Sequence, residues 1–472
     1  MEIAVQHPEY TYRFPDWVLL RDVLAGQREV KSKGQTYLPL ENNEGDENAF
    51  AERYDAYLKR ANFYNVTSRT LEGVVGQVFS KAPVTEFDGA WEYLEKDISG
   101  DGVTLEQQAK DVLTNVMGLG RAFLWVDYAE VEGDTSLADL ESGELRPVVF
   151  AYKPEDVVNW RTTTRGSKKL LSFVMLRESY VFKDDGYYVA YADQYRELRL
   201  TDAGYVVKVW RGGELYTEAT PTKRDGTVFE EIPGVFVGIK NNDAAVDKPP
   251  MLDMAHLNIA HYRNSADFEE SAFMVGQPTP WFTGITEQQL KLMGGKIRLG
   301  SRGGIQLPIN GMTGLLQVSE NSMCERAMAQ KEAQMLALGA KLVTDSQVAR
   351  TATEVTNDKV SEVSILASAA RNTSAAYARA FEFCGMFTGT TELPKFELST
   401  DFDLARMTSQ EVLAVLAVWQ AKGITTEEMR NVYRRGGYAT ENLEKAISAG
   451  VLKEVKLEEP VKAVDNNAKT AA

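Results

Sequence analysis

Cysteine, histidine and long hydrophobic runs are scarce in this sequence. Its 472 residues include two cysteines and three histidines. Both cysteines, Cys324 and Cys384, fall within expected helices, which excludes a disulfide framework and favours reduced thiols packed in a core. No window approaches the roughly 18 apolar residues of a membrane span, and the opening MEIAVQHPEY has no basic segment before an apolar one. These absences predict a soluble, unsecreted protein without a membrane partner.

Cations are outnumbered by anions along the chain. Asp and Glu total 68 against 52 Lys and Arg, a formal net charge of -16. A protein that holds DNA by neutralising phosphates needs an excess of cations. Tight non-specific DNA binding is therefore disfavoured as the main role, whereas DNA that slides past a weakly adhering wall is compatible with this charge.

The usual signatures of catalysis and cofactor binding are also missing. Neither a P-loop nor a G-x-S-x-G motif occurs. GLGRAF (Gly118–Phe123) leads from an expected helix into a strand, the reverse of a dinucleotide-binding loop. His256 and His261 are five residues apart, about 140° around a helix, so they do not form a metal pair. We expect no metal, no cofactor and no enzymatic activity, with an enzyme lacking a known motif as the alternative.

The remaining composition indicates a folded body of mixed class. Hydrophobic residues make up 44% and charged residues 25%, close to the average for globular domains. Helical periodicity covers 54–78 and 105–117, and a buried strand follows Gly120. From 148 to 240, alternating β-branched and aromatic residues between hairpin turns predict antiparallel strands. The fold class we predict is therefore α+β.

The second half of the chain predicts three long helices. The first spans 251–273, with a polar face that includes His256, Asn258, Arg263 and Asp267. A short insert of helix and strands separates it from the second, 322–340. After a polar connector, TATE (Thr351–Glu354) forms a capping box, and the third helix continues to 387, about 35 residues and about 50 Å. Its small residues favour close packing between neighbours, including other copies; burial in the chain's own core is the alternative.

Six segments in this order resemble the portal proteins of tailed bacteriophages, specifically a portal group catalogued as a domain of unknown function. They are YLKRANFYNVTSRTLEGVVGQVFSKAP (57–83), GLGRAFLWVDY (118–128), RPVVFAYKPEDVVNWR (146–161), PPMLDMAHLNIAHYRNSADFEESAFMVGQPTPWFTG (249–284), IRLGSRGGIQLP (297–308) and KEAQMLALGAKLV followed by RTATEV. Together they cover roughly residues 50 to 390, and their order is more specific than any one of them.

The resemblance implies an architecture in successive parts. These are a wing of helices and antiparallel sheet (1–248), a stem helix (249–275), a small α/β clip (276–317), a second stem helix (318–340), a tunnel loop (341–352), a long wing helix with a returning strand (353–405), a helical crown (406–452) and a disordered tail (453–472). It also implies a ring of twelve subunits at one vertex of the virion capsid, assembled in the host cytoplasm. Double-stranded DNA is packaged and ejected through that ring.

The resemblance further implies several partners. The clip would dock the terminase large subunit and later the head-completion or adaptor protein, and the ring would meet the major capsid and scaffolding proteins. The clip is locally basic, through Lys291, Lys296, Arg298 and Arg302, which suits an acidic partner; a solvated surface is the alternative. A minor capsid or connector protein without a DNA channel is the alternative function.

The connector KLVTDSQVAR would then project into the channel. Lys341 and Arg350 would contact phosphates, Asp345 would repel them, and Thr344, Ser346 and Gln347 would offer weak polar contacts. Phosphate contacts position DNA without specifying its sequence, so the expected effect is loose guidance. The alternative is a plain interhelical loop.

Overall fold

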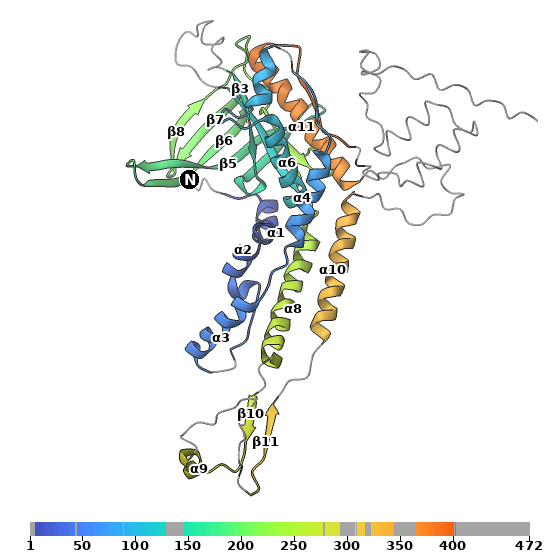
Figure 1. The fold of residues 1–472 in the computed structure, drawn as a ribbon. Helices are drawn as coiled ribbons and strands as arrows, with labels where there is room; N and C mark the ends of the chain where they lie inside the picture. Colours follow the sequence, from blue (N-terminus) through green and yellow to red (C-terminus); the bar gives the residue numbers. More distant parts are fainter. Residues whose placement is uncertain are drawn as a thin grey trace, which may run out of the picture. The chain divides into compact units, whose positions relative to one another are not determined.

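The computed structural model describes residues 5–42, 45–87, 89–128, 146–276, 279–292, 307, 309–316, 322–343, 364–400 and 402. The chain divides into two compact units, Met1–Thr400 and Asp401–Ala472. Residue 402 alone is described in the second unit, so the predicted crown and tail lie outside the described residues. The first unit combines helices with antiparallel sheets (Figure 1), which confirms the α+β class.

The α-helices of the described chain, in order, are α1 (Pro8–Ala25), α2 (Gln27–Ser32), α3 (Glu47–Arg60), α4 (Val66–Val78), α5 (Glu92–Lys96), α6 (Leu105–Leu119), α8 (Leu252–Gly276), α9 (Glu287–Leu292), α10 (Ser322–Val343) and α11 (Ile365–Thr388). The strands are β1 (Val84–Glu86), β2 (Arg121–Tyr128), β3 (Pro147–Tyr152), β4 (Val157–Arg165), β5 (Lys168–Asp184), β6 (Val189–Thr201), β7 (Gly204–Arg211), β8 (Glu214–Ala219), β9 (Gly234–Gly238), β10 (Thr279–Phe282), β11 (Thr313–Leu316) and β12 (Lys395–Glu397).

Two antiparallel sheets form the body of the unit. One has five strands in the order β4-β5-β6-β7-β8, and the other has three in the order β3-β2-β9. Their facing sides meet through Trp125 of β2, whose Nε1 donates to the Tyr205 hydroxyl of β7 at 2.9 Å, and through the Arg196 guanidinium, which lies 5.0 Å from the Trp125 ring centre. The antiparallel sheet predicted over 148–240 is confirmed.

The step from α6 into β2 follows the local sequence closely. Thr104 and Gln107 form a capping box at the start of the helix, and Gly120 ends it in the left-handed conformation at φ 88°. A Cβ at Gly120 would lie 2.8 Å from the Asp247 carbonyl oxygen. Glycine is thus required by both backbone angle and space, and β2 begins immediately afterwards as a buried strand.

Helix α11 lies in the core of its own chain. It packs on α6 and on strands β2, β9 and β12, and its alanines at 369, 370, 376 and 380 are buried there. The neighbours of these four residues belong to the same chain, so burial in the chain's own core, which the sequence left as the alternative, describes this part of the helix. Helix α11 begins at Ile365, where Ser364 is extended (ψ 149°) and its side chain accepts from the Ala367 N–H. The capping box predicted at Thr351–Glu354 lies outside the described residues.

The N-terminal helices differ from the sequence prediction in two ways. Residues 54–78 form two helices rather than one, because the chain is extended at Ala61 (ψ 137°) and Asn65 caps α4 by accepting from the Ser68 N–H. Helix α1 was not predicted at all. Its start carries Pro8 in the first turn and a His7 side chain that accepts from the Glu9 N–H, a signal that periodicity alone does not register.

Candidate functional site

The pair of helices α8 and α10 is the candidate site, because the predicted channel and docking segments adjoin it. The two helices lie side by side and antiparallel (Figure 1). Near one end of the pair, the Met254 methyl would lie 3.6 Å from a Cβ added at Gly339. Further along, His261 Nε2 lies 3.1 Å from Glu332 Oε1. Lys331 Nζ also donates to Asn264 Oδ1 at 3.5 Å. The insert from 277 to 321 joins them at one end, and the connector follows α10 at the other.

The polar residues of α8 hold it against the N-terminal helices. Asn258 is buried, accepts hydrogen bonds from Thr67 and donates to the Tyr64 carbonyl at 2.8 Å. The Tyr57 hydroxyl donates to Asp267 Oδ1 at 2.7 Å. The Arg263 Nε donates to the Tyr37 carbonyl at 2.8 Å. Most of the polar face predicted for this helix therefore binds protein, and His256 remains exposed.

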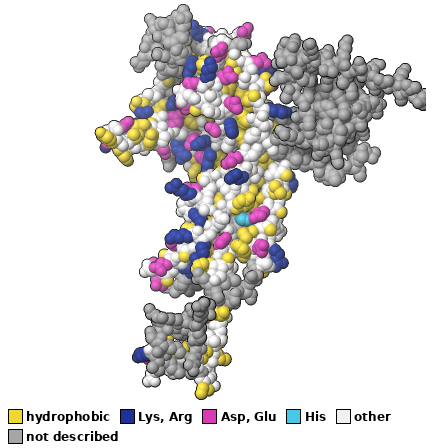
Figure 2. All heavy atoms as spheres, viewed as in Figure 1, with side chains coloured by type: hydrophobic (Ala, Val, Ile, Leu, Met, Phe, Trp, Pro, Cys, Tyr) yellow, Lys and Arg dark blue, Asp and Glu magenta, His cyan; other side chains and the backbone are white. Residues whose placement is uncertain are grey.

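Helix α10 is held on one side and open on the other. Met335 and Leu342 are buried. A Cβ at Gly339 would lie 3.1 Å from the Thr70 methyl of α4, so α10 and α4 approach closely there. On the outer side Leu336 is 76% exposed. Exposed alanines at 329, 333 and 337 share its face at helical spacing. Figure 2 shows hydrophobic side chains gathered over this helix pair. We call residues 329, 333, 336 and 337 the outer stripe.

The predicted tunnel-loop residues fall mostly outside the described residues. Lys341 is described and lies, exposed, in the last turn of α10, which continues to Val343 rather than ending at Ala340 as predicted. A basic residue is favourable there, since the carbonyl end of a helix carries partial negative charge. Thr344, Asp345, Ser346, Gln347 and Arg350 all lie outside the described part of the chain.

One of the four basic clip residues is described. Lys291 on α9 forms an exposed ion pair with Glu287 at 3.0 Å, so its charge is locally matched. Lys296, Arg298 and Arg302 lie outside the described residues. The predicted clip contains an antiparallel strand pair that the sequence placed only in part: β10 pairs with β11, and the Trp281 ring covers Gly314. The β10 strand was missed because Pro278 precedes it and Pro280 lies within it.

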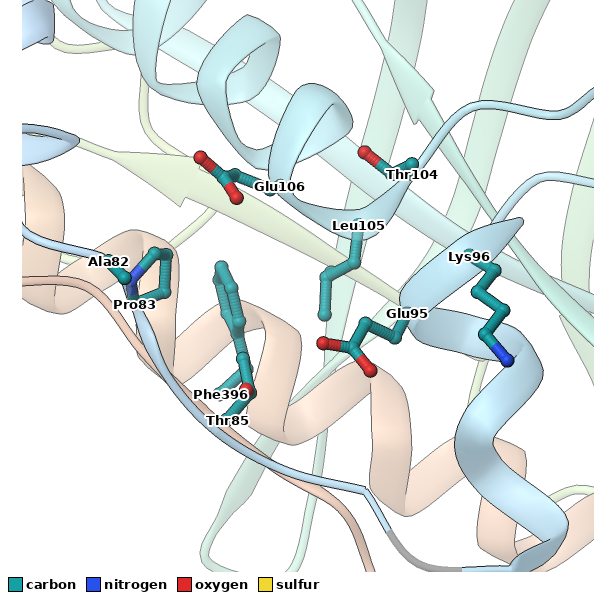
Figure 3. Close-up of a pocket in the computed structure, with 9 residues that line it drawn as sticks. All are labelled: Ala82, Pro83, Thr85, Glu95, Lys96, Thr104, Leu105, Glu106 and Phe396. Carbon is teal, nitrogen blue, oxygen red and sulfur yellow. The ribbon is translucent and has the colours of Figure 1, made fainter.

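A separate pocket of about 430 Å³ lies beside α5 and α6 (Figure 3). It is lined by Ala82, Pro83, Thr85, Glu95, Lys96, Thr104, Leu105, Glu106 and Phe396. Histidine, cysteine and serine are absent from this lining, so the pocket offers none of the usual pairs of nucleophile and imidazole base. Glu106 lies in the first turn of α6, where a carboxylate stabilises the helix.

In the ranges that the structure describes, His, Cys, Asp and Glu side chains form no group of three or more arranged to hold a metal ion. Among the described helices, none is both long enough and apolar enough to cross a bilayer. Cys384 is buried in α11, where burial raises the pKa of its thiol well above the ordinary range.

Comparisons with known proteins give a family match to part of the chain and a distant similarity to solved structures. Residues 250–388, less than half of the chain, match the family described as "Domain of unknown function (DUF4055)". A chain of "Neck of empty GTA particle computed with C6 symmetry" is 13% identical with a TM-score of 0.40, covering 86% of this chain and 94% of that one. A chain of "Neck of native GTA particle computed with C12 symmetry" is 12% identical with a TM-score of 0.36, covering 79% and 91%. No curated protein matches.

Proposed function

We propose that this chain is a structural subunit of a tailed-phage particle, and more specifically a portal subunit. In this proposal identical copies form a ring at one capsid vertex, and double-stranded DNA passes through it during packaging and ejection. The observation that carries it is the antiparallel pair of α8 and α10. An insert joins the pair at one end, a connector follows it at the other, and an apolar outer stripe faces solvent.

The outer stripe supports assembly of several copies. Contiguous apolar surface on a helix is costly to leave in water and commonly marks an interface. Alanines around Leu336 allow another helix to approach closely. A ring requires the same contact to be repeated between successive copies until it closes. The proposed contact therefore sits on the stem of each subunit, while α11 stabilises the subunit internally.

The charge of the chain suits DNA as cargo. With a net charge of -16 the protein repels phosphates at long range, so DNA would move past it without adhering. The exposed Lys341 at the end of α10 would give one weak phosphate contact per copy, and the connector beyond it would supply the other contacts with DNA.

We propose the insert 276–317 as the docking site for the terminase large subunit and then for a head-completion or adaptor protein. We also propose that the chain is not an enzyme.

Native mass spectrometry of the purified full chain, paired with negative-stain images, tests the ring. The expected result is closed rings of about twelve copies, the number that the family resemblance implies, with a central hole. A stable dimer or tetramer without a channel contradicts the proposal, as does a chain that stays monomeric when co-assembled with its shell proteins. A ring without an open channel would identify a connector or minor capsid protein instead.

Deletion of 343–347 tests the tunnel-loop assignment separately. Rings with the same number of subunits are expected to form, and the amount of packaged DNA per particle is expected to fall. A deletion of equal length in the C-terminal segment, 466–470, is the matched control. Normal packaging by rings that lack 343–347 would remove the assignment while leaving the ring proposal in place.

A further inference from the structure

Strands β5 and β6 continue past the rest of their sheet as a two-stranded ribbon. Within the described chain β7 ends at Arg211, which pairs with Gln194, and β4 pairs with β5 only as far as Leu176. Residues 179–193 therefore pair only with one another. We call this segment the β5–β6 ribbon. An isolated two-stranded ribbon is marginally stable in water. The extension of β5 and β6 beyond the sheet is therefore not explained by stability alone.

The ribbon carries the densest group of exposed large apolar side chains in the described chain. They are Val181, Phe182, Tyr187, Tyr188, Val189 and Tyr191. Figure 2 shows hydrophobic side chains at the end of the ribbon, which Figure 1 labels through β5 and β6. Tyrosine-rich exposed patches are enriched in protein interfaces, because tyrosine offers large contact area at a low cost in side-chain entropy. The ribbon thus has the composition of a binding surface.

The turn of the ribbon is held in a single conformation. Asp184 Oδ1 accepts from the Gly186 N–H at 2.8 Å, and Asp185 Oδ1 accepts from the N–H groups of Tyr187 and Tyr188 at 3.0 and 2.7 Å. These backbone hydrogen bonds hold the pKa of Asp185 below its usual range. The aromatic side chains are therefore presented from a hydrogen-bonded turn with the ionised carboxylate of Asp185 beside them.

The two edges of the ribbon differ in a way that selects one of them. On β5 the register shifts between Val181 and Lys183, so that Phe182 forms a bulge next to a lysine. Bulges and lysines are the usual means of protecting an edge strand from pairing with another chain. Residues 189–193 of β6 lie opposite that bulge, but each of them pairs with a β5 residue, and they contain neither proline nor lysine. The β6 edge is the one left available.

The side chains along that edge alternate in a defined chemical order. Val189, Tyr191 and Asp193 share one face because alternate residues of a strand point the same way, and all three are exposed. Ala190 and Ala192 occupy the other face and leave it shallow. The ribbon as a whole holds three aspartates and one lysine. A strand lying beside β6 would place one side chain against Tyr191 and another, two residues away, against Asp193.

We propose that the β6 edge of the ribbon binds an extended segment of another protein by strand addition. The segment carries an apolar residue against Tyr191 and a lysine or arginine against Asp193. Main-chain hydrogen bonds along the edge supply affinity, and the alternating side chains supply selectivity. The local charge argues against pairing with the same edge of a second copy, since the ribbon holds three aspartates and one lysine. This inference is independent of the proposed ring, because it concerns a different strand and a different partner.

The experiment pans the full-length chain against a displayed library of random linear peptides. A labelled synthetic form of the enriched sequence is then titrated by fluorescence anisotropy. Sequences with a lysine or arginine two positions from an apolar residue are expected. Tyr191→Ser and Asp193→Lys are each expected to weaken binding about threefold to tenfold.

The matched controls are Tyr12→Ser on α1 and Asp202→Lys, which lies in the turn at the opposite end of β6. Both control variants are expected to bind the peptide as the parent does. Far-UV circular dichroism verifies that every variant is folded.

Several outcomes would overturn the proposal. These are the absence of enriched sequences, enrichment of acidic sequences, and binding that Asp193→Lys leaves unchanged. Enrichment of a sequence found in this chain would assign the edge to a second copy instead. Binding of the protein to phosphatidylcholine vesicles that Tyr187→Ser abolishes would assign the ribbon to a membrane surface. Each of these results is obtained whether or not the protein forms rings.

Discussion

Asn258 on α8 accepts two hydrogen bonds from Thr67 on α4, one from the backbone N–H at 3.2 Å and one from the hydroxyl at 3.0 Å. Both residues are fully buried. The Asn258 amide also donates to the Tyr64 carbonyl just before α4. A single side chain thus joins the helix pair to the start of α4 and fixes how α8 leaves the body of the protein.

Replacing that side chain should destabilise the fold strongly. In Asn258→Ala the N–H and hydroxyl of Thr67 lose the buried acceptor that Asn258 supplies, which costs about 2–4 kcal/mol of unfolding free energy. Urea denaturation followed by circular dichroism measures the loss. Asn48→Ala, at an exposed position of α3, is the control and should change stability by less than about 0.5 kcal/mol. Equal effects of the two variants would contradict the role given to Asn258.

Gly120 and Gly102 form a matched pair for testing local strain. Both have positive φ, 88° and 86°, but a Cβ at Gly120 would lie 2.8 Å from the Asp247 carbonyl, whereas nothing lies within 4 Å at Gly102. Gly102→Ala should cost about 1–2 kcal/mol from the backbone conformation alone. Gly120→Ala should cost clearly more, because the neighbouring backbone must also move. Thermal melts of the two variants compare them directly; similar melting temperatures would show that the contact is unimportant.

Glu178 should govern part of the acid sensitivity of the protein. Burial by itself raises the pKa of Glu178, but hydrogen bonds and charge from Arg196, with hydrogen bonds from Tyr152 and Gln194, outweigh burial and hold that pKa below its usual value. A lowered pKa in the folded state stabilises the protein above the unfolded pKa of about 4.3. That stabilisation is lost as the pH falls through the lower, folded-state value.

The variant Glu178→Gln checks the sign of this effect. It should lower the unfolding free energy at pH 7 by about 2–4 kcal/mol, because Arg196 remains partly buried without its carboxylate. The difference between parent and variant should shrink as the pH falls below about 4.3. Urea titrations over a pH series measure it. A difference that stays constant with pH would contradict the assignment.

Leu336 should decide whether the subunits assemble. Leu336→Glu places a charge in the outer stripe and, in the proposed ring, desolvates it at every contact at a cost of about 2 kcal/mol or more. The expected result is a folded monomer in native mass spectrometry and an unchanged circular dichroism spectrum. Gln334→Glu adds the same charge at an exposed position of α10 that points about 160° away from Leu336 around the helix, and it should leave the oligomer intact. Rings formed by Leu336→Glu would show that the outer stripe is not the interface.

Some elements could be predicted because their signals are local. The helical periodicity over 105–117, the glycine at 120 and the apolar run after it predicted a helix, its end and a buried strand within a short stretch of chain, and α6 and β2 confirm them. The alternation over 148–240 likewise predicted antiparallel strands, and β3 to β9 confirm them. Such signals work because hydrogen bonding and side-chain periodicity act between neighbours in sequence.

The candidate site was less predictable. The sequence separated α8 from α10 and marked the connector, but it placed Lys341 in the loop, whereas helical hydrogen bonding continues to Val343. It predicted close packing around the small residues of α11 without settling whether the neighbours were other copies, whereas β2 and β9 of the same chain pack on this helix. The boundaries of the proposed portal parts remain predictions, as do the residues assigned to the tunnel loop and the clip.

The sequence by itself determined the mixed class, the antiparallel strands, the excess of negative charge and the absence of the catalytic motifs sought, since each depends on composition or on short-range pattern. Only the tertiary structure decided which polar residues of α8 are buried, which face of α10 is left open and how far β5 and β6 extend past β7. Those properties depend on which residues pack against a given side chain. Residues distant in sequence, such as Thr67 and Asn258, come into contact only when the chain is folded.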